Sequence, residues 1–170
     1  QDRVRLLEEE SIRGINRQAP IAMLFASRCN TKDIKPITDK CWYGQGSQPL
    51  FLYRSGFGSK NDSYLGVKGG SPMNSHAHMD SGSFIYEWGG VRWAVELGSQ
   101  DYHSLESKGI GLWKKGQQSD RWRVYRLNNY SHNTLTINEQ LHQYKGMATM
   151  EKVINKKKIQ GVQFDLSSLF

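Results

Sequence analysis

The stretch that decides the fold is SFIYEWGGVRWAVEL, residues 83–97. Apolar and polar residues alternate over residues 91–97, and this period of two is typical of a β-strand. Residues 83–88 have the aromatic and β-branched composition of a strand. The dipeptide Gly89-Gly90 between the two runs is a hairpin turn signal. The stretch therefore predicts two antiparallel strands joined by a tight turn.

Further strand-like runs lie on both sides of this hairpin. The composition predicts strands at residues 50–54, 64–68, 121–127, 134–138, 149–155 and 160–166. Many short strands separated by glycine-containing turns predict an all-β fold, an antiparallel β-sandwich. The beginning of the chain differs, because residues 5–29 read as helical, with a second short helix starting near Pro20. We therefore expect a short helical segment followed by the sandwich.

Length and charge limit the possible functions. The 170 residues suffice for one domain, or for one domain and a fragment of another. The formal net charge of +7 favours an anionic partner such as nucleic acid, a membrane surface or an acidic polysaccharide. No phosphate-binding loop motif is present, which disfavours a nucleotide enzyme. No apolar run reaches the ~20 residues of a membrane span.

The two ends of the chain and its cysteines carry further expectations. The helical start is too short to bury its own apolar faces, and residues 161–170 resemble the beginning of an unfinished element. We therefore expect a piece of a larger protein. Cys29 and Cys41 can form a disulfide in an oxidising compartment or remain free thiols, and the sequence leaves both alternatives open.

Two histidines and an aspartate lie immediately before the hairpin, at alternate positions of SHAHMDSGSF, residues 75–84. On an extended strand His76, His78 and Asp80 would share one face. Three such groups can form a metal site, a proton-transfer site, or both side by side. Orienting one of the two imidazoles is the role that we expect for Asp80.

Glu96 and His132 are further candidates for a metal site. Glu96 lies on the polar face of the predicted strand 91–97, where a buried unpaired carboxylate would be costly. A solvated face or an ion pair with Arg92 is the alternative. His132 precedes the predicted strand 134–138, where a turn or capping role is the alternative. Together with His78 the two side chains supply two nitrogens and one oxygen, a set that suits zinc.

Other residues are candidates for contact with a substrate. The segment RWRVYR, residues 121–126, is predicted to place its arginines on one strand face, where Arg121 and Arg123 would bind carboxylate or sulfate groups. A solvated outer face is an equally weighted alternative. Tyr102 lies in the irregular stretch after residue 97, where binding residues are common, and we predict that it is catalytic. Ordinary loop packing is the alternative for Tyr102.

Four segments occur in a characteristic order: KGGS at 68–71, HAHMDSGSF at 76–84, RWAVELG at 92–98 and SHNTL at 131–135. The ordered set resembles the heparinase II/III-like family of polysaccharide lyases, which includes heparin lyases and oligoalginate lyases. The resemblance covers about residues 42–170. It implies an incomplete α/α toroid followed by antiparallel β-sandwich domains. Residues 1–35 would then be the tail of the toroid or a linker, and residues 36–170 a sandwich truncated at its C-terminus.

The resemblance also implies roles for single residues. His78, Glu96 and His132 match the family's zinc ligands, although the middle ligand is typically an aspartate. His76 matches the family's catalytic histidine, and the remaining catalytic groups belong to the toroid. A lyase removes the proton α to a uronate carboxylate and expels the C4 oxygen, so it needs a base, an acid and a positive charge. Neutral His76 is suited to be the base. The zinc would be structural and hold the loop that aims His76.

We therefore predict part of a polysaccharide lyase, periplasmic or secreted, that cleaves uronic-acid-containing acidic polysaccharides by β-elimination. The chain by itself is expected to show little or no activity, because the toroid supplies half of the active site. One alternative is a non-catalytic carbohydrate-binding β-sandwich with a structural metal. Another is a metal-dependent hydrolase, which is disfavoured because Ser81 occupies the position of a second-metal histidine.

Overall fold

The computed structural model describes residues 19–30, 32 and 35–170, and divides the chain into two units, residues 1–38 and 39–170. The first unit contains helix α2 (Ala19–Arg28), which agrees with the helix predicted near Pro20. Residues 5–18 of the predicted helical region lie outside the described residues. No helix in the described part of the chain is long and apolar enough to cross a membrane.

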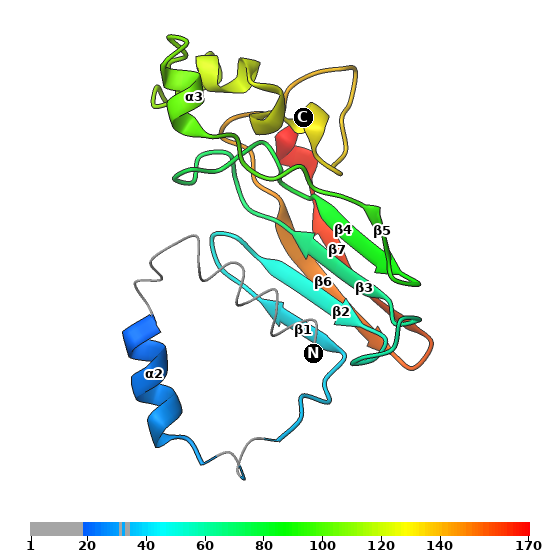
Figure 1. The fold of residues 1–170 in the computed structure, drawn as a ribbon. Helices are drawn as coiled ribbons and strands as arrows, with labels where there is room; N and C mark the ends of the chain where they lie inside the picture. Colours follow the sequence, from blue (N-terminus) through cyan, green and yellow to red (C-terminus); the bar gives the residue numbers. More distant parts are fainter. Residues whose placement is uncertain (1–18, 31, 33–34) are drawn as a thin grey trace. The chain divides into compact units, whose positions relative to one another are not determined.

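The second unit is built on a five-stranded antiparallel sheet whose strands follow one another in chain order (Figure 1). The strands are β1 (Cys41–Gly44), β2 (Leu50–Arg54), β3 (Tyr64–Lys68), β4 (Phe84–Trp88) and β5 (Val91–Ala94). The sequence did not predict β1, because the surrounding segment is polar and loop-like. The other four strands agree with the predicted ones, except that β5 ends at Ala94.

The turn between β4 and β5 explains why this hairpin is recognisable in the sequence. Gly89 and Gly90 have φ angles of 64° and 77°, in the left-handed region that glycine adopts without steric cost. Positive φ at both central residues matches the twist of a two-residue hairpin turn. The hairpin predicted for residues 83–97 is confirmed.

A second antiparallel sheet, formed by β6 (Thr149–Lys156) and β7 (Ile159–Asp165), lies behind the first one (Figure 1). Strands β2 and β7 contact each other, and Phe51 of β2 is fully buried. A Cβ atom on Gly69 would lie 2.5 Å from the Phe164 ring and 2.6 Å from the Ala148 carbonyl oxygen. The close approach of the two sheets therefore requires glycine at this position. The antiparallel β-sandwich is confirmed.

Short helices and loops cover one end of the five-stranded sheet (Figure 1). They are α3 (Tyr102–Glu106) and the 3₁₀ helices η2 (Asp120–Arg123), η3 (Tyr125–Leu127) and η4 (Asn129–Ser131), with η5 (Ser167–Leu169) close to the end of the chain. A small cluster of buried leucines, Leu105, Leu112 and Leu127, holds this end region together.

The end region corrects two predicted strands. Residues 121–127 form 3₁₀ helices instead of a strand, and residues 134–138, all of them described, form no strand. The Ser119 hydroxyl accepts a hydrogen bond from the Arg121 N–H, and the Asn128 side chain accepts one from the Tyr130 N–H. Such bonds from side chain to backbone compete with sheet formation and favour short helical turns.

Candidate active site and metal centre

The histidine segment lies in the connection between β3 and β4, and the extended conformation predicted for it is wrong. His76 has a φ angle of 59°, and the Ala77 N–H donates to the Asn74 carbonyl at 3.1 Å, which closes a turn. Ala77 and Met79 are buried and anchor the loop, whereas His76 is exposed. His76 and His78 therefore do not share a strand face. A left-handed conformation at a residue other than glycine stores strain, as is common at functional sites.

The structure brings together the two residues predicted to be catalytic. His76 Nδ1 lies 3.4 Å from the hydroxyl oxygen of Tyr102, which begins helix α3. Their rings are stacked, with centroids 5.9 Å apart and planes at 10°. The exposed Trp113 indole packs edge-on against His76, with 5.5 Å between ring centroids. An exposed imidazole and a half-buried phenol, both groups that are able to exchange protons, thus lie in contact, and the catalytic roles of His76 and Tyr102 stay predictions.

Arg121 holds this pair from behind. Its side chain is buried, and its guanidinium donates to the Ala77 carbonyl from Nε at 3.2 Å and from Nη2 at 2.9 Å. Nη2 also donates to the His76 carbonyl at 3.1 Å and to the Tyr102 hydroxyl at 3.3 Å. The arginine therefore fixes both the strained backbone of the loop and the hydroxyl that faces His76.

Arg123 has a different environment, so the row of arginines predicted on one strand face is wrong. Its side chain is exposed and contacts Asp120 at 3.5 Å. The 3₁₀ turn of η2 separates the two arginines, because only an extended strand returns alternate residues to the same face. The substrate-binding roles of Arg121 and Arg123 stay predictions. Nothing in the sequence indicated that Arg121 is buried.

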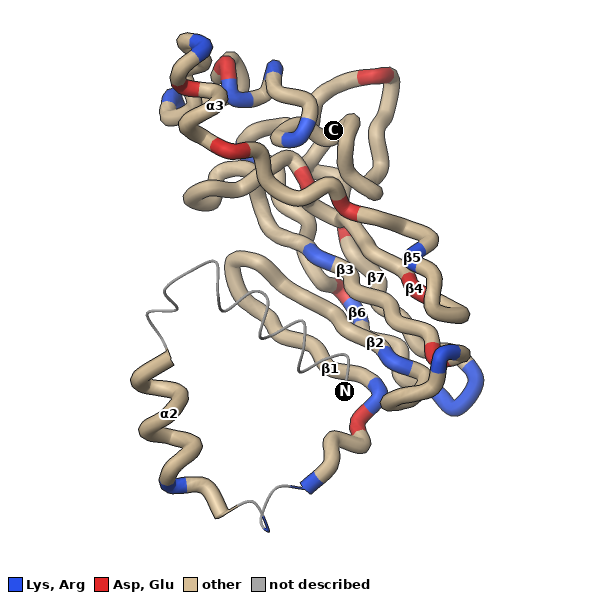
Figure 2. Tube along the Cα trace, viewed as in Figure 1, with Lys and Arg blue, Asp and Glu red and all other residues tan. Residues whose placement is uncertain are grey.

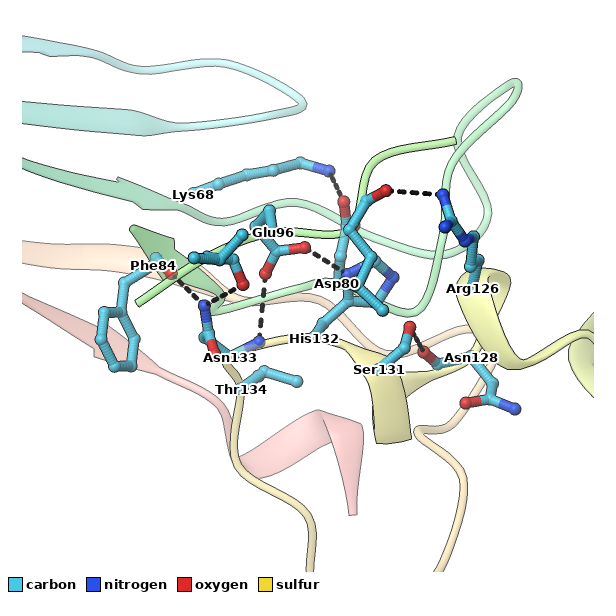
Figure 3. Close-up of polar contacts among 12 residues, drawn as sticks. Lys68, Asp80, Phe84, Glu96, Arg126, Asn128, Ser131, His132, Asn133 and Thr134 are labelled. Carbon is cyan, nitrogen blue, oxygen red and sulfur yellow. Dashed lines mark hydrogen bonds and ion pairs between the residues drawn. The ribbon is translucent and has the colours of Figure 1, made fainter. Parts of the chain in front are cut away.

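Glu96 and His132, 36 residues apart in the chain, meet directly (Figure 3). His132 Nδ1 lies 2.6 Å from Glu96 Oε2, and Glu96 Oε1 accepts a hydrogen bond from the Asn133 N–H at 3.1 Å. Burial acts to raise the pKa of Glu96, but the hydrogen bonds from His132 and Asn133 outweigh it and lower this pKa below its ordinary value. Glu96 is therefore a carboxylate at neutral pH and accepts both hydrogen bonds.

The Asn133 side chain connects the Glu96–His132 pair to the sheet through hydrogen bonds, a role that the sequence did not reveal. Its Nδ2 atom donates to the carbonyl of Phe84 at 3.0 Å and to that of Val95 at 2.9 Å (Figure 3). One amide group therefore ties the loop after η4 to β4 and to the segment that follows β5. The only signal in the sequence was the position of Asn133 next to His132.

The two histidines of this cluster have the properties of metal ligands. An ionised carboxylate can only accept, so His132 Nδ1 carries a proton, and in the neutral imidazole the lone pair is then on Nε2. Nε2 is buried and has no hydrogen-bond partner among the described residues. The His78 ring lies 5.3 Å from the His132 ring, centroid to centroid. Burial lowers the pKa of His78 to about 4 despite the charge of Asp80, so His78 is neutral at pH 7. Neutral imidazoles are the form that binds a metal.

The role of Glu96 in the metal site differs from that of the histidines. Both of its oxygens are engaged, one by His132 and one by Asn133. A carboxylate that accepts from the distal ring nitrogen of a histidine typically orients a metal ligand. Within residues 19–30, 32 and 35–170, no group of three His, Cys, Asp or Glu side chains is arranged to hold a metal ion. The ligand set of His78, Glu96 and His132 stays a prediction.

Two expected carboxylate contacts are replaced by others. Asp80 pairs with Lys68, at 2.5 Å between Oδ2 and Nζ, instead of orienting an imidazole (Figure 3). The lysine at the end of β3 reaches the loop and neutralises the aspartate. Arg92 donates from Nε to Glu87 Oε1 at 2.5 Å, so the alternative ion pair with Glu96 does not form. The β4–β5 register places Glu87 opposite Arg92.

His76 and His78 line different cavities. His78 faces a cavity of about 460 Å³ on the sheet, which Glu96 and His132 also line. His76 lines a smaller cavity of about 140 Å³ beside Trp113. The segment thus separates a candidate metal centre from a candidate proton-transfer site.

The family model described as heparinase II/III-like, C-terminal, matches residues 51–165, which is more than half of the chain. The chain belongs to the heparinase II/III-like family. No curated protein matches it. The residues of this heparinase II/III-like chain that the family model matches include His76 and its neighbours. They also include the cluster of His78, Glu96 and His132.

Proposed function

We propose that the chain is part of a polysaccharide lyase that cleaves uronic-acid-containing acidic polysaccharides by β-elimination. The observation that carries the proposal is the His76–Tyr102 pair, 3.4 Å apart, within a heparinase II/III-like domain. Both side chains are able to exchange protons, His76 is exposed and Tyr102 half-buried, and a buried guanidinium holds them in place. Because such polysaccharides lie outside the cytoplasm, the proposal includes a periplasmic or secreted location.

The elimination needs one proton to leave and another to arrive. Neutral His76 takes the proton from C5 of the uronate, the electrons of that bond form the C4–C5 double bond, and the C4–O bond breaks. The Tyr102 hydroxyl gives its proton to the departing oxygen. The imidazolium and the phenolate are then in hydrogen-bond contact, so the proton passes from His76 to Tyr102 and restores the site.

Arg121 contributes to this step through its charge. Its Nη2 atom donates to the Tyr102 hydroxyl oxygen at 3.3 Å, so this oxygen acts as an acceptor and its own proton can be given to the departing oxygen. A fixed positive charge beside this oxygen stabilises the phenolate that forms during the transfer. Further catalytic groups, which the family resemblance assigns to a toroid, would complete the site.

We propose further that the second cluster binds a zinc ion as a structural element. When bound, the metal would tie the histidine loop to the segment after η4 and so support the position of His76. His78 and the unpartnered Nε2 of His132 would hold it, with Glu96 in the ligand set or orienting His132. Metal analysis of the purified chain tests this proposal. About one zinc per chain is expected, with a large loss in His78→Ala and none in His103→Ala, which removes an exposed histidine.

Product formation tests the lyase proposal. Heparan sulfate, chondroitin sulfate and alginate are incubated with the longest natural polypeptide that contains these residues, and the ultraviolet absorbance of the unsaturated uronate is followed. His76→Ala should lower turnover by ~10²–10⁴-fold, the usual contribution of a general acid or base. His103→Ala is the matched control and should keep its activity.

The same variants separate the alternatives. A carbohydrate-binding sandwich without catalysis would give no unsaturated product and would bind polysaccharide equally well with His76→Ala. A metal-dependent hydrolase would give saturated products and lose its activity on chelation. Either result would refute the lyase proposal.

A further inference from the structure

The cavity beside His76 has walls that suit an anion. It is lined by the cationic side chains of Lys114, Lys115 and Arg121, and none of the described residues that line it is an aspartate or a glutamate. The exposed Trp113 indole forms an apolar wall next to His76. A recess lined by one sign of charge concentrates the opposite charge.

Two acidic side chains of this end region, Glu106 and Asp120, already have partners. Glu106 accepts a hydrogen bond from Trp113 Nε1 at 2.7 Å, which fixes the indole at the edge of the cavity. Asp120 contacts Arg123 at 3.5 Å. Neither carboxylate forms an ion pair with the lysines among the described residues. The positive charge of the cavity therefore has no internal partner.

Arg121 keeps part of its guanidinium available. Its hydrogen bonds to the carbonyls of His76 and Ala77 and to the Tyr102 hydroxyl use Nε and Nη2 only. Nη1 makes no hydrogen bond with any described residue and is not among the fully buried unsatisfied atoms. Arg121 lines the cavity, and an arginine with one edge held by hydrogen bonds to the backbone is preorganised to bind an anion.

The size of the cavity limits what can enter. Its volume of about 140 Å³ is close to the ~150 Å³ of a protein cavity that holds one benzene molecule. One acidic substituent and part of one sugar ring fill such a space, whereas several sugar units do not.

We propose that this cavity binds a single acidic group of the polysaccharide, a carboxylate or a sulfate, and so positions one sugar ring against His76. The ion contacts are to Lys114, Lys115 and Nη1 of Arg121, and the ring packs on Trp113. The inference rests on the proposed function, because the acidic group belongs to the sugar that reacts. For a uronate, a neutralised carboxylate also stabilises the carbanion that forms at the adjacent carbon.

Calorimetric titration of the full chain tests this proposal with three short oligosaccharides of equal length. An alginate oligosaccharide carries carboxylates only, a sulfated dextran oligosaccharide carries sulfates only, and a plain dextran oligosaccharide carries neither. Binding of one or both acidic probes identifies the acidic group, and the neutral probe should not bind. Equal affinity for all three probes would refute the anion site.

A charge-matched pair of variants locates the site. The double variant Lys114→Gln/Lys115→Gln should weaken binding of the acidic probe about tenfold, the equivalent of about 1.4 kcal/mol. Lys157→Gln/Lys158→Gln removes the same charge from the hairpin turn between β6 and β7 and should change affinity less than about twofold (Figure 2). Equal losses in the two double variants would show non-specific attraction and overturn the assignment.

Failure of the cavity assignment can be distinguished from failure of the lyase proposal. If Lys114→Gln/Lys115→Gln keeps full affinity while His76→Ala abolishes turnover, the cavity assignment fails and the lyase stands. If the lysine variant loses affinity and no form of the protein makes an unsaturated product, the cavity stands as a binding site and the lyase fails.

Discussion

Replacing Arg121 with methionine should destabilise the loop that carries His76. Arg121→Met keeps the length of the aliphatic stem but removes every hydrogen bond that the guanidinium makes. The carbonyls of Ala77 and His76 and the hydroxyl of Tyr102 lose their donor. No other described residue donates to the Ala77 carbonyl.

The size of the effect follows from burial. An unsatisfied buried acceptor costs ~1–3 kcal/mol, and hydrogen bonds to charged donors contribute ~1.5–3 kcal/mol. Ala77 is 7% exposed, so its carbonyl bears most of this cost, whereas water can reach the carbonyl of the exposed His76. The left-handed backbone at His76 is no longer held and relaxes, which recovers ~1–2 kcal/mol of strain. We expect a net loss of about 2–4 kcal/mol in the free energy of unfolding.

Urea unfolding of the full chain, followed by tryptophan fluorescence, measures this loss. Arg123→Met is the matched control, because it removes the same groups from the same 3₁₀ helix at a side chain that is 83% exposed. An exposed ion pair contributes little, so the control should change stability by less than ~1 kcal/mol. Arg121→Lys keeps the charge and should give an intermediate loss.

The arginine also has a predicted effect on the site that stability alone does not report. Compared with Arg121→Met, the Arg121→Lys variant should regain more of the free energy of unfolding than of the turnover. An ammonium group cannot hold the two carbonyls and the Tyr102 hydroxyl in one plane. Equal stability of Arg121→Met and Arg123→Met would refute the reasoning. So would an Arg121→Lys variant with wild-type stability and wild-type turnover.

Three further outcomes are expected in the same unfolding assay. Glu96→Gln should lose ~1–3 kcal/mol in the free energy of unfolding, because an amide can no longer accept both hydrogen bonds. The control is Glu87→Gln, whose exposed partner is Arg92. A loss in Glu96→Gln no greater than in this control would contradict the role of Glu96. Gly69→Ala should lose ~1–3 kcal/mol or more, because the new methyl group overlaps the second sheet; Gly161→Ala, with no atom within 4 Å of the added Cβ, is the control and should not show this loss. Burial lowers the pKa of His142 in the folded state, although its hydrogen bond to the Leu135 carbonyl opposes the shift. The unfolded chain therefore binds the proton first as the pH falls through ~6.5, and stability is full above that value and decreases below it by up to ~1.4 kcal/mol per pH unit. His142→Gln should flatten this slope, and an unchanged slope would show that other groups cause it.

The strands of the first sheet could be predicted because their signals are local. Residues 91–97 alternate with a period of two, and Gly89-Gly90 supplies the only backbone geometry that a two-residue hairpin tolerates easily. The segment 121–127 shows why the same reasoning fails elsewhere. Its alternation of arginines with apolar residues suggested a strand, but capping by the Ser119 side chain and burial of Trp122 stabilise 3₁₀ turns instead.

The candidate site shows a similar division. The residue types in HAHMD, together with Glu96 and His132, were sufficient to name metal and proton-transfer chemistry. Their arrangement was not predictable, because the loop departs from the extended conformation at His76. The positive φ at His76 depends on carbonyl contacts with Arg121, which lies 45 residues further along the chain.

The sequence by itself determined every described strand except β1, the family and the chemical groups present, because these depend on residue type and on spacing within a few positions. Only the tertiary structure decided which groups meet. It pairs His132 with Glu96 across 36 residues and His76 with Tyr102 across 26. It also buries Arg121 behind the histidine loop and leaves a cation-lined cavity beside it. These contacts depend on sheet register and on the packing of the end region, which no local pattern encodes.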